Sequence, residues 1–194
     1  MMDFSMFRWL NPPAVFEIKA ESLRVVTEPK TDFWQRTYYG FQNDNAPAFL
    51  RSIKDDFSFT VKTTFDSHTQ FDQCGLIIYQ DSENWFKASI EYENSEIARL
   101  GSVVTNLGYS YWATTDISAQ IRTMWYRLSR RGQDFLIENS ENGQQFNQMR
   151  IFHLHQPLEE VYFGVYACSP LASSFEALFT DFSLTPSTWA LHPV

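Results

Sequence analysis

Apolar side chains recur at every second position along most of this chain, which is the period of a β-strand with one buried face. In the clearest run, apolar or β-branched residues alternate with polar ones, and the former are Phe57, Phe59, Val61, Thr63 and Phe65. Residues 74–79 are apolar at successive positions, which predicts a strand buried on both faces at the centre of a sheet. No window of useful length shows the 3.6-residue period of an amphipathic helix.

Short clusters of Asp, Asn, Ser, Gly and Pro separate the predicted strands. Besides 57–65 and 74–79, the strands are predicted over residues 85–93, 98–106, 121–130, 133–139, 161–168 and 175–184. Because no Gly-, Ser- or Pro-rich linker divides the chain, we expect a single domain over residues 1–194. Many short strands at this spacing predict an all-β fold, a two-sheet antiparallel sandwich of the jelly-roll type.

The charge balance argues against nucleic acid and against anionic membranes as partners. The formal net charge is −8, and the arginines of the basic cluster at residues 127–131 divide between the two faces of a strand. The N-terminus shows no secretory signal, and no apolar run approaches the ~20 residues of a membrane helix. We therefore expect a cytoplasmic location, in which Cys74 and Cys168 are reduced, buried thiols.

Residues 85–93 carry the most informative strand face. Trp85, Lys87, Ser89 and Glu91 share one face of this strand, whereas the alternate positions are mainly apolar. A large ring beside a cation, a hydroxyl and a carboxylate is typical of a groove for a polar ligand, with Trp85 stacking on a sugar ring. The alternative is an ordinary solvated face with a weak surface salt bridge.

Several motifs stand in an order that resembles a known family. They are Asp-Gln-Cys-Gly-Leu at 72–76, Trp-Phe-Lys at 85–87, Ser-Val-Val-Thr-Asn at 102–106, Trp-Tyr-Arg-Leu at 125–128, Gly-Val-Tyr-Ala-Cys-Ser-Pro at 164–170 and Phe-Thr-Asp-Phe at 179–182. Together they resemble the DUF1349 family over about residues 7–186. The resemblance implies a fold of the concanavalin A-like lectin/glucanase type, whose concave face binds or cleaves glycans in relatives of that fold. It implies no established activity.

Two further patterns suggest chemistry but have simpler explanations. Glu91, Glu93 and Glu96 are spaced almost like the carboxylates of glucanases of this fold, yet residues 93–96 read as a hairpin turn that would carry Glu96 away from a groove. His153 and His155 share a strand face, but a metal site needs a third ligand, and none is evident. We therefore predict no metal, no cofactor and no assigned catalytic residue, with Glu91 the acid or base if there is one.

The sequence thus favours a protein that binds a carbohydrate or a sugar-like small molecule rather than an enzyme. The predicted ligand-binding residues on the concave sheet are Trp85, Lys87, Glu91, Thr105, Trp112 and Arg127. Trp34 is a further candidate for the rim of the groove. A glycoside hydrolase using Glu91 stays open as an alternative. So does a protein-binding metabolic regulator, since one yeast member of the family is named as a regulator. Exposed edge strands also leave a homodimer open.

Overall fold

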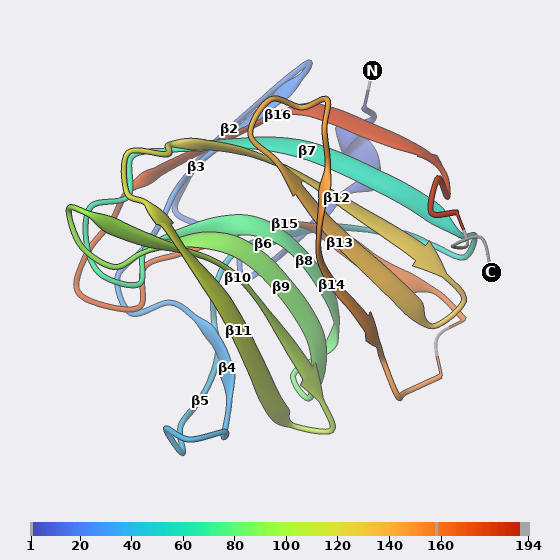
Figure 1. Ribbon diagram of the computed structural model, residues 1–194, viewed down its shortest axis with the longest axis horizontal. Coiled ribbons are helices and arrows are strands. Elements are labelled where there is room, and N and C mark those ends of the chain that lie inside the picture. The colour runs from blue at the N-terminus through green and yellow to red at the C-terminus, as the bar shows by residue number, and fades with distance from the viewer. Residues whose placement is uncertain (1, 158, 191–194) are drawn as a thin grey trace.

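The computed structural model describes residues 2–157 and 159–190. Within these residues the chain forms two large antiparallel sheets that pack face to face (Figure 1). Sheet A has the order β1 (Arg8–Leu10), β6 (Ala48–Ile53), β15 (Val161–Cys168), β8 (Gln73–Asp81), β9 (Asn84–Tyr92), β10 (Ile97–Asn106), β11 (Tyr109–Ser118). Sheet B has the order β14 (Asn147–His153), β13 (Asp134–Ser140), β12 (Thr123–Arg131), β7 (Phe57–Phe65), β16 (Glu176–Pro186), β3 (Ser22–Val26), β2 (Val15–Lys19). This arrangement confirms the predicted all-β, two-sheet sandwich.

The main core fills the space between the two sheets. Phe57, Phe59 and Val61 of β7 point into it and are completely buried, as their alternation predicts. Aromatic rings from the two sheets meet there, with Phe57 and Phe163 stacked at 4.3 Å between ring centroids. Strand β8 is the middle strand of sheet A, and Leu76 and Ile78 are fully buried, which confirms the predicted central strand.

The pattern does not predict the four strands at the edges of the sheets, β1, β2, β11 and β14. Edge strands pack on one neighbour only and bury little, so their side chains carry a weak alternating signal. In β2 every residue is exposed. The short strands β3 and β6 are also unpredicted. The turn predicted at residues 93–96 is confirmed, because β9 ends at Tyr92 and β10 begins at Ile97.

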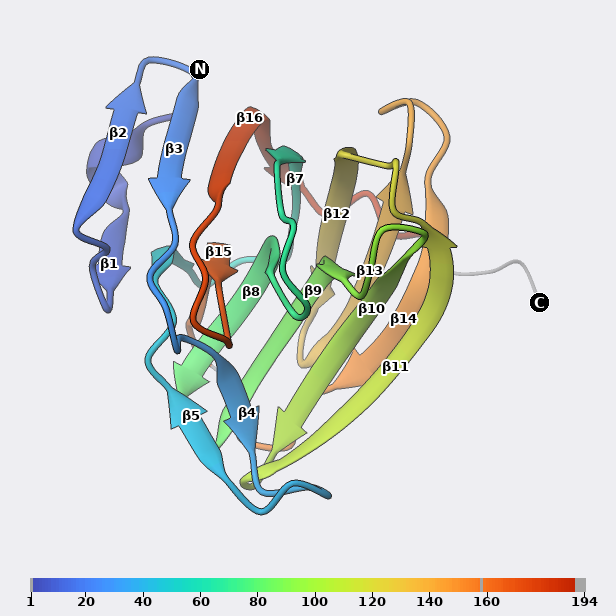
Figure 2. The same cartoon turned by 90° about the vertical axis from the view of Figure 1, so that its left-hand side faces the viewer.

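A small hairpin of β4 (Phe33–Gln35) and β5 (Gln42–Asp44) covers part of the face of sheet A that points away from sheet B (Figures 1 and 2). Phe33 and Trp34 are buried there against Ile77, Trp85 and Val103 of the sheet, in a second hydrophobic cluster. Because this cluster lies outside the sandwich, the strands beneath it are buried on both faces.

The hairpin is also tied to the turn between β10 and β11. Arg36 donates to Glu83 at 2.7 Å and to the carbonyl of Gly108 at 2.8 Å. Gly108 has φ +78, and a Cβ at this position would lie 2.0 Å from the Glu83 carboxylate. Glycine adopts this left-handed backbone without strain, and its lack of a Cβ leaves room for the Glu83 carboxylate and the Arg36 guanidinium.

The remaining regular element is a 3-10 turn, η1, at Phe4–Met6. No helix among the described residues is long and apolar enough to span a bilayer.

Candidate functional site

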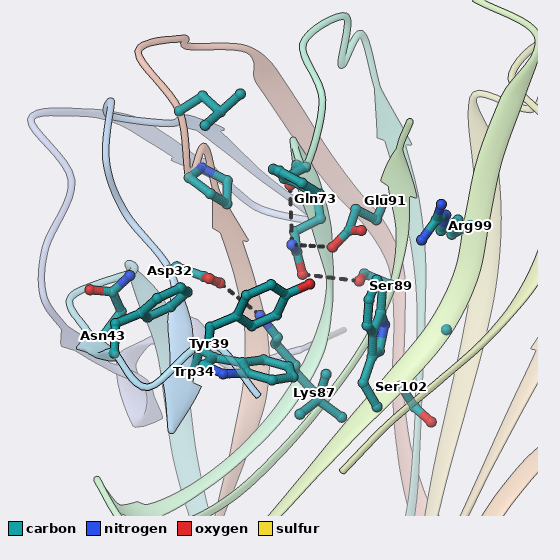
Figure 3. A pocket seen from close by; sticks show the side chains of 17 residues that line it. Asp32, Trp34, Tyr39, Asn43, Gln73, Lys87, Ser89, Glu91, Arg99 and Ser102 are labelled. Carbon is teal, nitrogen blue, oxygen red and sulfur yellow. Dashed lines mark hydrogen bonds and ion pairs between the residues drawn. The ribbon is translucent and has the colours of Figure 1, made fainter. Parts of the chain in front are cut away.

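A pocket of about 280 Å³ lies between the outer face of sheet A and the β4–β5 hairpin (Figure 3). Its floor comes from β8, β9 and β10, one wall from the hairpin, and the opposite wall from β11. Phe71, Pro170 and Leu171 close the remaining side. Polar groups gather on the floor and aromatic rings on the walls, which is the arrangement that small-molecule sites usually have.

Strand register brings the polar groups of the floor side by side. Glu91 of β9 pairs with Gln73 of β8 on one side and with Arg99 of β10 on the other. Two residues along, Ser89 pairs with Gly101, where β11 lies so close that a Cβ would come within 2.8 Å of the Ala113 carbonyl. Residues directly opposite on antiparallel strands lie ~4.5–5.5 Å apart, so these side chains form one continuous polar surface.

Lys87 and Asp32 form a buried ion pair at 2.8 Å at the base of the hairpin wall. Asp32 also accepts the backbone N–H of Phe33 at 2.8 Å. Lys87 is 4% exposed, and its ammonium lies 5.7 Å from the ring centroid of Tyr166. Burial is the largest single influence and lowers the pKa of Lys87, but the charge and hydrogen bond of Asp32, together with the neighbouring Cys168 and Glu91, outweigh it, and the pKa is raised overall. The amine is therefore charged and already occupied, and it fixes the start of the hairpin.

Gln73 uses all of its hydrogen-bonding capacity: one bond holds Glu91, and the other three fix the Gln73 amide itself. Its amide nitrogen donates to the Glu91 carboxyl at 2.8 Å and to the Phe71 carbonyl at 3.1 Å. Its amide oxygen accepts the hydroxyls of Tyr166 at 2.8 Å and Ser89 at 3.4 Å. An amide held at four points cannot rotate freely, so the Glu91 carboxyl is held at one place in the floor.

Glu91 is the titratable group of the site with the most altered chemistry. Burial raises the pKa of its carboxyl from 4.5 to about 7, with Lys87 opposing and Asp32 reinforcing the change. Its Oε1 atom is buried and has no hydrogen-bond partner among the described residues. Near neutral pH this carboxyl exists in both forms, so it can donate a hydrogen bond to a ligand or accept one.

Five aromatic side chains line the pocket, and three of them, Trp34, Tyr39 and Trp112, are linked by ring contacts. The rings of Trp34 and Tyr39 meet edge to face at 5.3 Å, and those of Trp34 and Trp112 at 6.4 Å. The Arg99 guanidinium lies 5.7 Å from the Trp112 ring centroid, which holds both side chains at the pocket. Trp34 is only 7% exposed, whereas Tyr39 is 49% exposed. The walls are therefore rigid at depth and open at the mouth.

The structure brings together three of the six predicted ligand-binding residues. Lys87, Glu91 and Trp112 all line the pocket. Trp34, the candidate for the rim, lines it as well.

Trp85 and Thr105 lie on the predicted face but beneath the hairpin. Both are completely buried. Trp85 packs at 5.9 Å from the ring of Phe33. Thr105 shares a hydrogen bond with Ser110 at 2.8 Å, and Ser110 in turn accepts the Gln35 N–H at 2.9 Å. Neither side chain lines the pocket, so both support the hairpin instead of facing a ligand.

The placement of Arg127 on the concave sheet is wrong. Arg127 belongs to β12 of sheet B, and its guanidinium pairs with Glu138 at 2.7 Å and lies over the Phe146 ring at 4.1 Å. Arg127 and Trp125 lie on the same face of one strand, but the alternation of apolar and polar residues does not show which of the two sheets that strand joins.

Sequence reasoning misses Asp32 and Tyr39 as parts of the site, because it does not predict the β4–β5 hairpin. The available signal is the density of rings between residues 33 and 41, where Phe, Trp and Tyr recur in a segment without strand alternation. The sequence does not show where such a segment lies in the fold, because the positions of its rings depend on their packing against sheet A.

The other sequence candidates have structural roles. Cys74 and Cys168 are free and buried, and burial raises the pKa of both thiols, which keeps them protonated. His153 pairs with Asp134 at 2.7 Å on the surface. Among the described residues, no three His, Cys, Asp or Glu side chains are grouped so that they could hold a metal ion.

Comparisons with known proteins agree with this fold. The family model described as "Protein of unknown function (DUF1349)" matches residues 9–187. The chain is 30% identical over 192 residues to "Regulation of enolase protein 1" of Saccharomyces cerevisiae, covering 98% of this chain and 95% of that protein. The crystal structure of a functionally unknown protein from Saccharomyces cerevisiae matches with a TM-score of 0.90 at 27% identity, covering 97% of this chain and 100% of that one.

A more distant likeness concerns the fold alone. The carbohydrate binding module CBM66 from Bacillus subtilis matches with a TM-score of 0.56 at 13% identity. The match covers 91% of this chain and 94% of the module. The two chains therefore share a sandwich architecture over nearly their whole lengths.

Proposed function

Because the chain belongs to the DUF1349 family of proteins of unknown function, we propose that it binds a carbohydrate in the pocket between sheet A and the β4–β5 hairpin. The observation that carries this proposal is the pairing of aromatic walls with a polar floor in one pocket of about 280 Å³. A sugar ring presents apolar C–H faces and a rim of hydroxyls, so stacking rings and fixed hydrogen-bonding groups suit it together. The fold shared with a carbohydrate binding module supports the same proposal.

The charges of the site suit a neutral sugar. The Lys87 ammonium forms an ion pair with Asp32, and the Arg99 guanidinium forms one with the Glu93 carboxylate at 3.4 Å. Glu91 leaves one carboxyl oxygen without a partner. An anionic ligand would meet the carboxyl groups of Asp32 and Glu91, whereas a hydroxyl can both donate and accept and so satisfies either form of Glu91.

The site favours binding over hydrolysis. A glycosidase needs two carboxyl groups free to act on the same bond, one as acid and one as base or nucleophile. Glu91 has the raised pKa of an acid, but the other carboxylate of the pocket, Asp32, is held by Lys87 and the Phe33 N–H. We therefore assign the pocket to recognition, in a protein that we place in the cytoplasm.

The variant Trp112→Ala tests the proposal, and Tyr111→Ala is its control. Trp112 lines the pocket, whereas the side chain of Tyr111 lies on the opposite face of β11 and is 60% exposed. Thermal unfolding and calorimetry with a panel of neutral mono- and oligosaccharides should identify a ligand, and a sugar at 100 times its Kd should add about 2.7 kcal/mol to the free energy of unfolding. Trp112→Ala should weaken that binding about tenfold or more, the equivalent of ~1.4 kcal/mol.

Tyr111→Ala should bind like the unchanged protein. Equal losses in the two variants would mean that the walls of the pocket do not contact the sugar. If no sugar in the panel binds, and a protein is instead captured stoichiometrically, the regulator alternative replaces the carbohydrate proposal.

A further inference from the structure

Tyr38, in the loop between β4 and β5, is an exposed aromatic residue on a left-handed backbone. Its side chain is 92% exposed, and its backbone has φ +62, in the left-handed region. A residue other than glycine costs free energy there. An exposed ring returns almost none of that free energy, because it removes little apolar surface from water.

The loop holds this conformation through its own hydrogen bonds. Arg36 N–H donates to the Phe41 carbonyl at 2.9 Å, and Gly40 N–H donates to the Arg36 carbonyl at 2.7 Å. Tyr39 N–H donates to the Thr37 carbonyl at 2.7 Å. The Tyr38 ring is thus displayed on a loop whose conformation is defined by hydrogen bonds.

The Tyr38 ring continues the aromatic wall of the pocket outward. Its centroid lies 4.9 Å from that of Tyr39, which meets Trp34 at 5.3 Å inside the pocket. Trp34 in turn meets Trp112 at 6.4 Å. Aromatic surface therefore runs without a break from solvent to the far wall, although Tyr38 itself does not line the pocket.

The size of the pocket limits how much ligand it can enclose. Its volume of about 280 Å³ lies just below the ~300–1,000 Å³ of pockets that enclose drug-sized molecules. One sugar unit suits that space, and a second linked unit would have to lie outside the mouth, where Tyr39 is half exposed and Tyr38 projects.

We propose that the pocket takes the terminal unit of an oligosaccharide and that Tyr38 forms a second subsite, on which the next sugar unit stacks. This inference rests on the proposed carbohydrate function and extends it from a single sugar to a chain. The exposed Tyr38 ring, which meets the ring of Tyr39 edge to face, offers the flat surface that the apolar face of a second sugar needs. Tyr38 has only two side-chain torsions to fix, so stacking costs little conformational entropy.

The experiment compares chain lengths in calorimetric and NMR titrations. The probes are glucose, cellobiose and cellotetraose, the β-1,4-xylose series of the same lengths, and the β-1,4-mannose series. The unchanged protein should gain at least fivefold in affinity from one unit to two and little beyond that. Tyr38→Ala should lose this gain while binding the monosaccharide within twofold of the unchanged protein.

Two further variants separate the ring from the backbone. Tyr38→Phe keeps the stacking ring and should keep the gain, whereas Tyr38→Asn suits the left-handed backbone and should lose it. Tyr111→Ala, which removes an exposed tyrosine elsewhere, should behave like the unchanged protein.

The outcomes distinguish the two proposals. If monosaccharides bind but length adds nothing, or if Tyr38→Ala keeps the full gain, the second subsite is wrong and the carbohydrate function stands. If no member of any series binds, the carbohydrate function is wrong and the subsite with it.

Discussion

Glu91 shows how one side chain acquires its chemistry from its neighbours. Its carboxyl is held by Gln73, faces Arg99 across the strand pair, and lies near the charges of Lys87, Asp32 and Glu93. Burial is the largest influence and raises its pKa to about 7. Sequence alone identifies the residue as a candidate, but only these contacts make it a group that changes charge near neutral pH.

This altered pKa predicts a pH-dependent stability. Between pH 4.5 and about 7 the folded protein keeps a proton on Glu91 that the unfolded chain has lost. The contribution of Glu91 is therefore complete below pH 4.5 and is lost as the pH rises to about 7, on the order of 3 kcal/mol in all. Glu91→Gln carries no such proton, so the difference in unfolding free energy between the two proteins should change across this window. Urea denaturation at pH 5, 6, 7 and 8 measures it, and a constant difference would contradict a raised pKa.

The β4–β5 hairpin converts an open sheet face into a site. It supplies Asp32, Trp34 and Tyr39 to the pocket. It also buries Trp85 and Thr105, which would otherwise be exposed on the outer face of sheet A. We therefore expect the hairpin, the pocket and the second hydrophobic cluster to open together, so their stability should depend also on buried residues that do not line the pocket.

Trp85→Ala should therefore destabilise the protein instead of only removing a binding contact. Trp85 is completely buried, and its indole N–H donates to the Ser82 carbonyl at 3.2 Å. Loss of a buried tryptophan typically costs about 3–5 kcal/mol, and limited proteolysis should cut the loosened hairpin first. Denaturant unfolding measures the change beside Tyr111→Ala, which should lie within ~0.5 kcal/mol of the unchanged protein. A stable Trp85→Ala variant would show that the second cluster contributes little.

The whole molecule separates its two sheets by role. Sheet A carries the pocket on its outer face, whereas the outer face of sheet B carries paired surface charges such as Arg127 with Glu138. Both sheets share the main core, so either can be damaged by core substitutions. Only substitutions near the pocket should change ligand affinity without a change in stability.

Arg127→Ala tests this separation. The Arg127–Glu138 pair is partly exposed, so its loss should cost ~0–1 kcal/mol. Sugar affinity should stay within twofold of the unchanged protein, because β12 does not reach the pocket. Titration calorimetry and urea denaturation check both values, and a large loss of affinity would place part of the ligand on sheet B.

The long interior strands are predictable from this sequence, whereas the edge strands and the short interior strands β3 and β6 are not. The alternation of Phe57, Phe59 and Val61 reflects packing on a core that every interior strand shares. Strands β2 and β11 lie at sheet edges and expose most of their side chains, so their sequences show little alternation of apolar and polar residues.

The sandwich, the central strand at 74–79, the turn at 93–96 and the strand face that carries Lys87 and Glu91 can all be predicted from the sequence, because a period of two follows from local backbone geometry. Tertiary packing is needed to place Arg127 in sheet B, to cover Trp85 and to bring Trp112 to the pocket. It also decided that the aromatic segment at 33–41 folds back as a wall. These outcomes depend on contacts between distant segments, which alternation along one strand cannot encode.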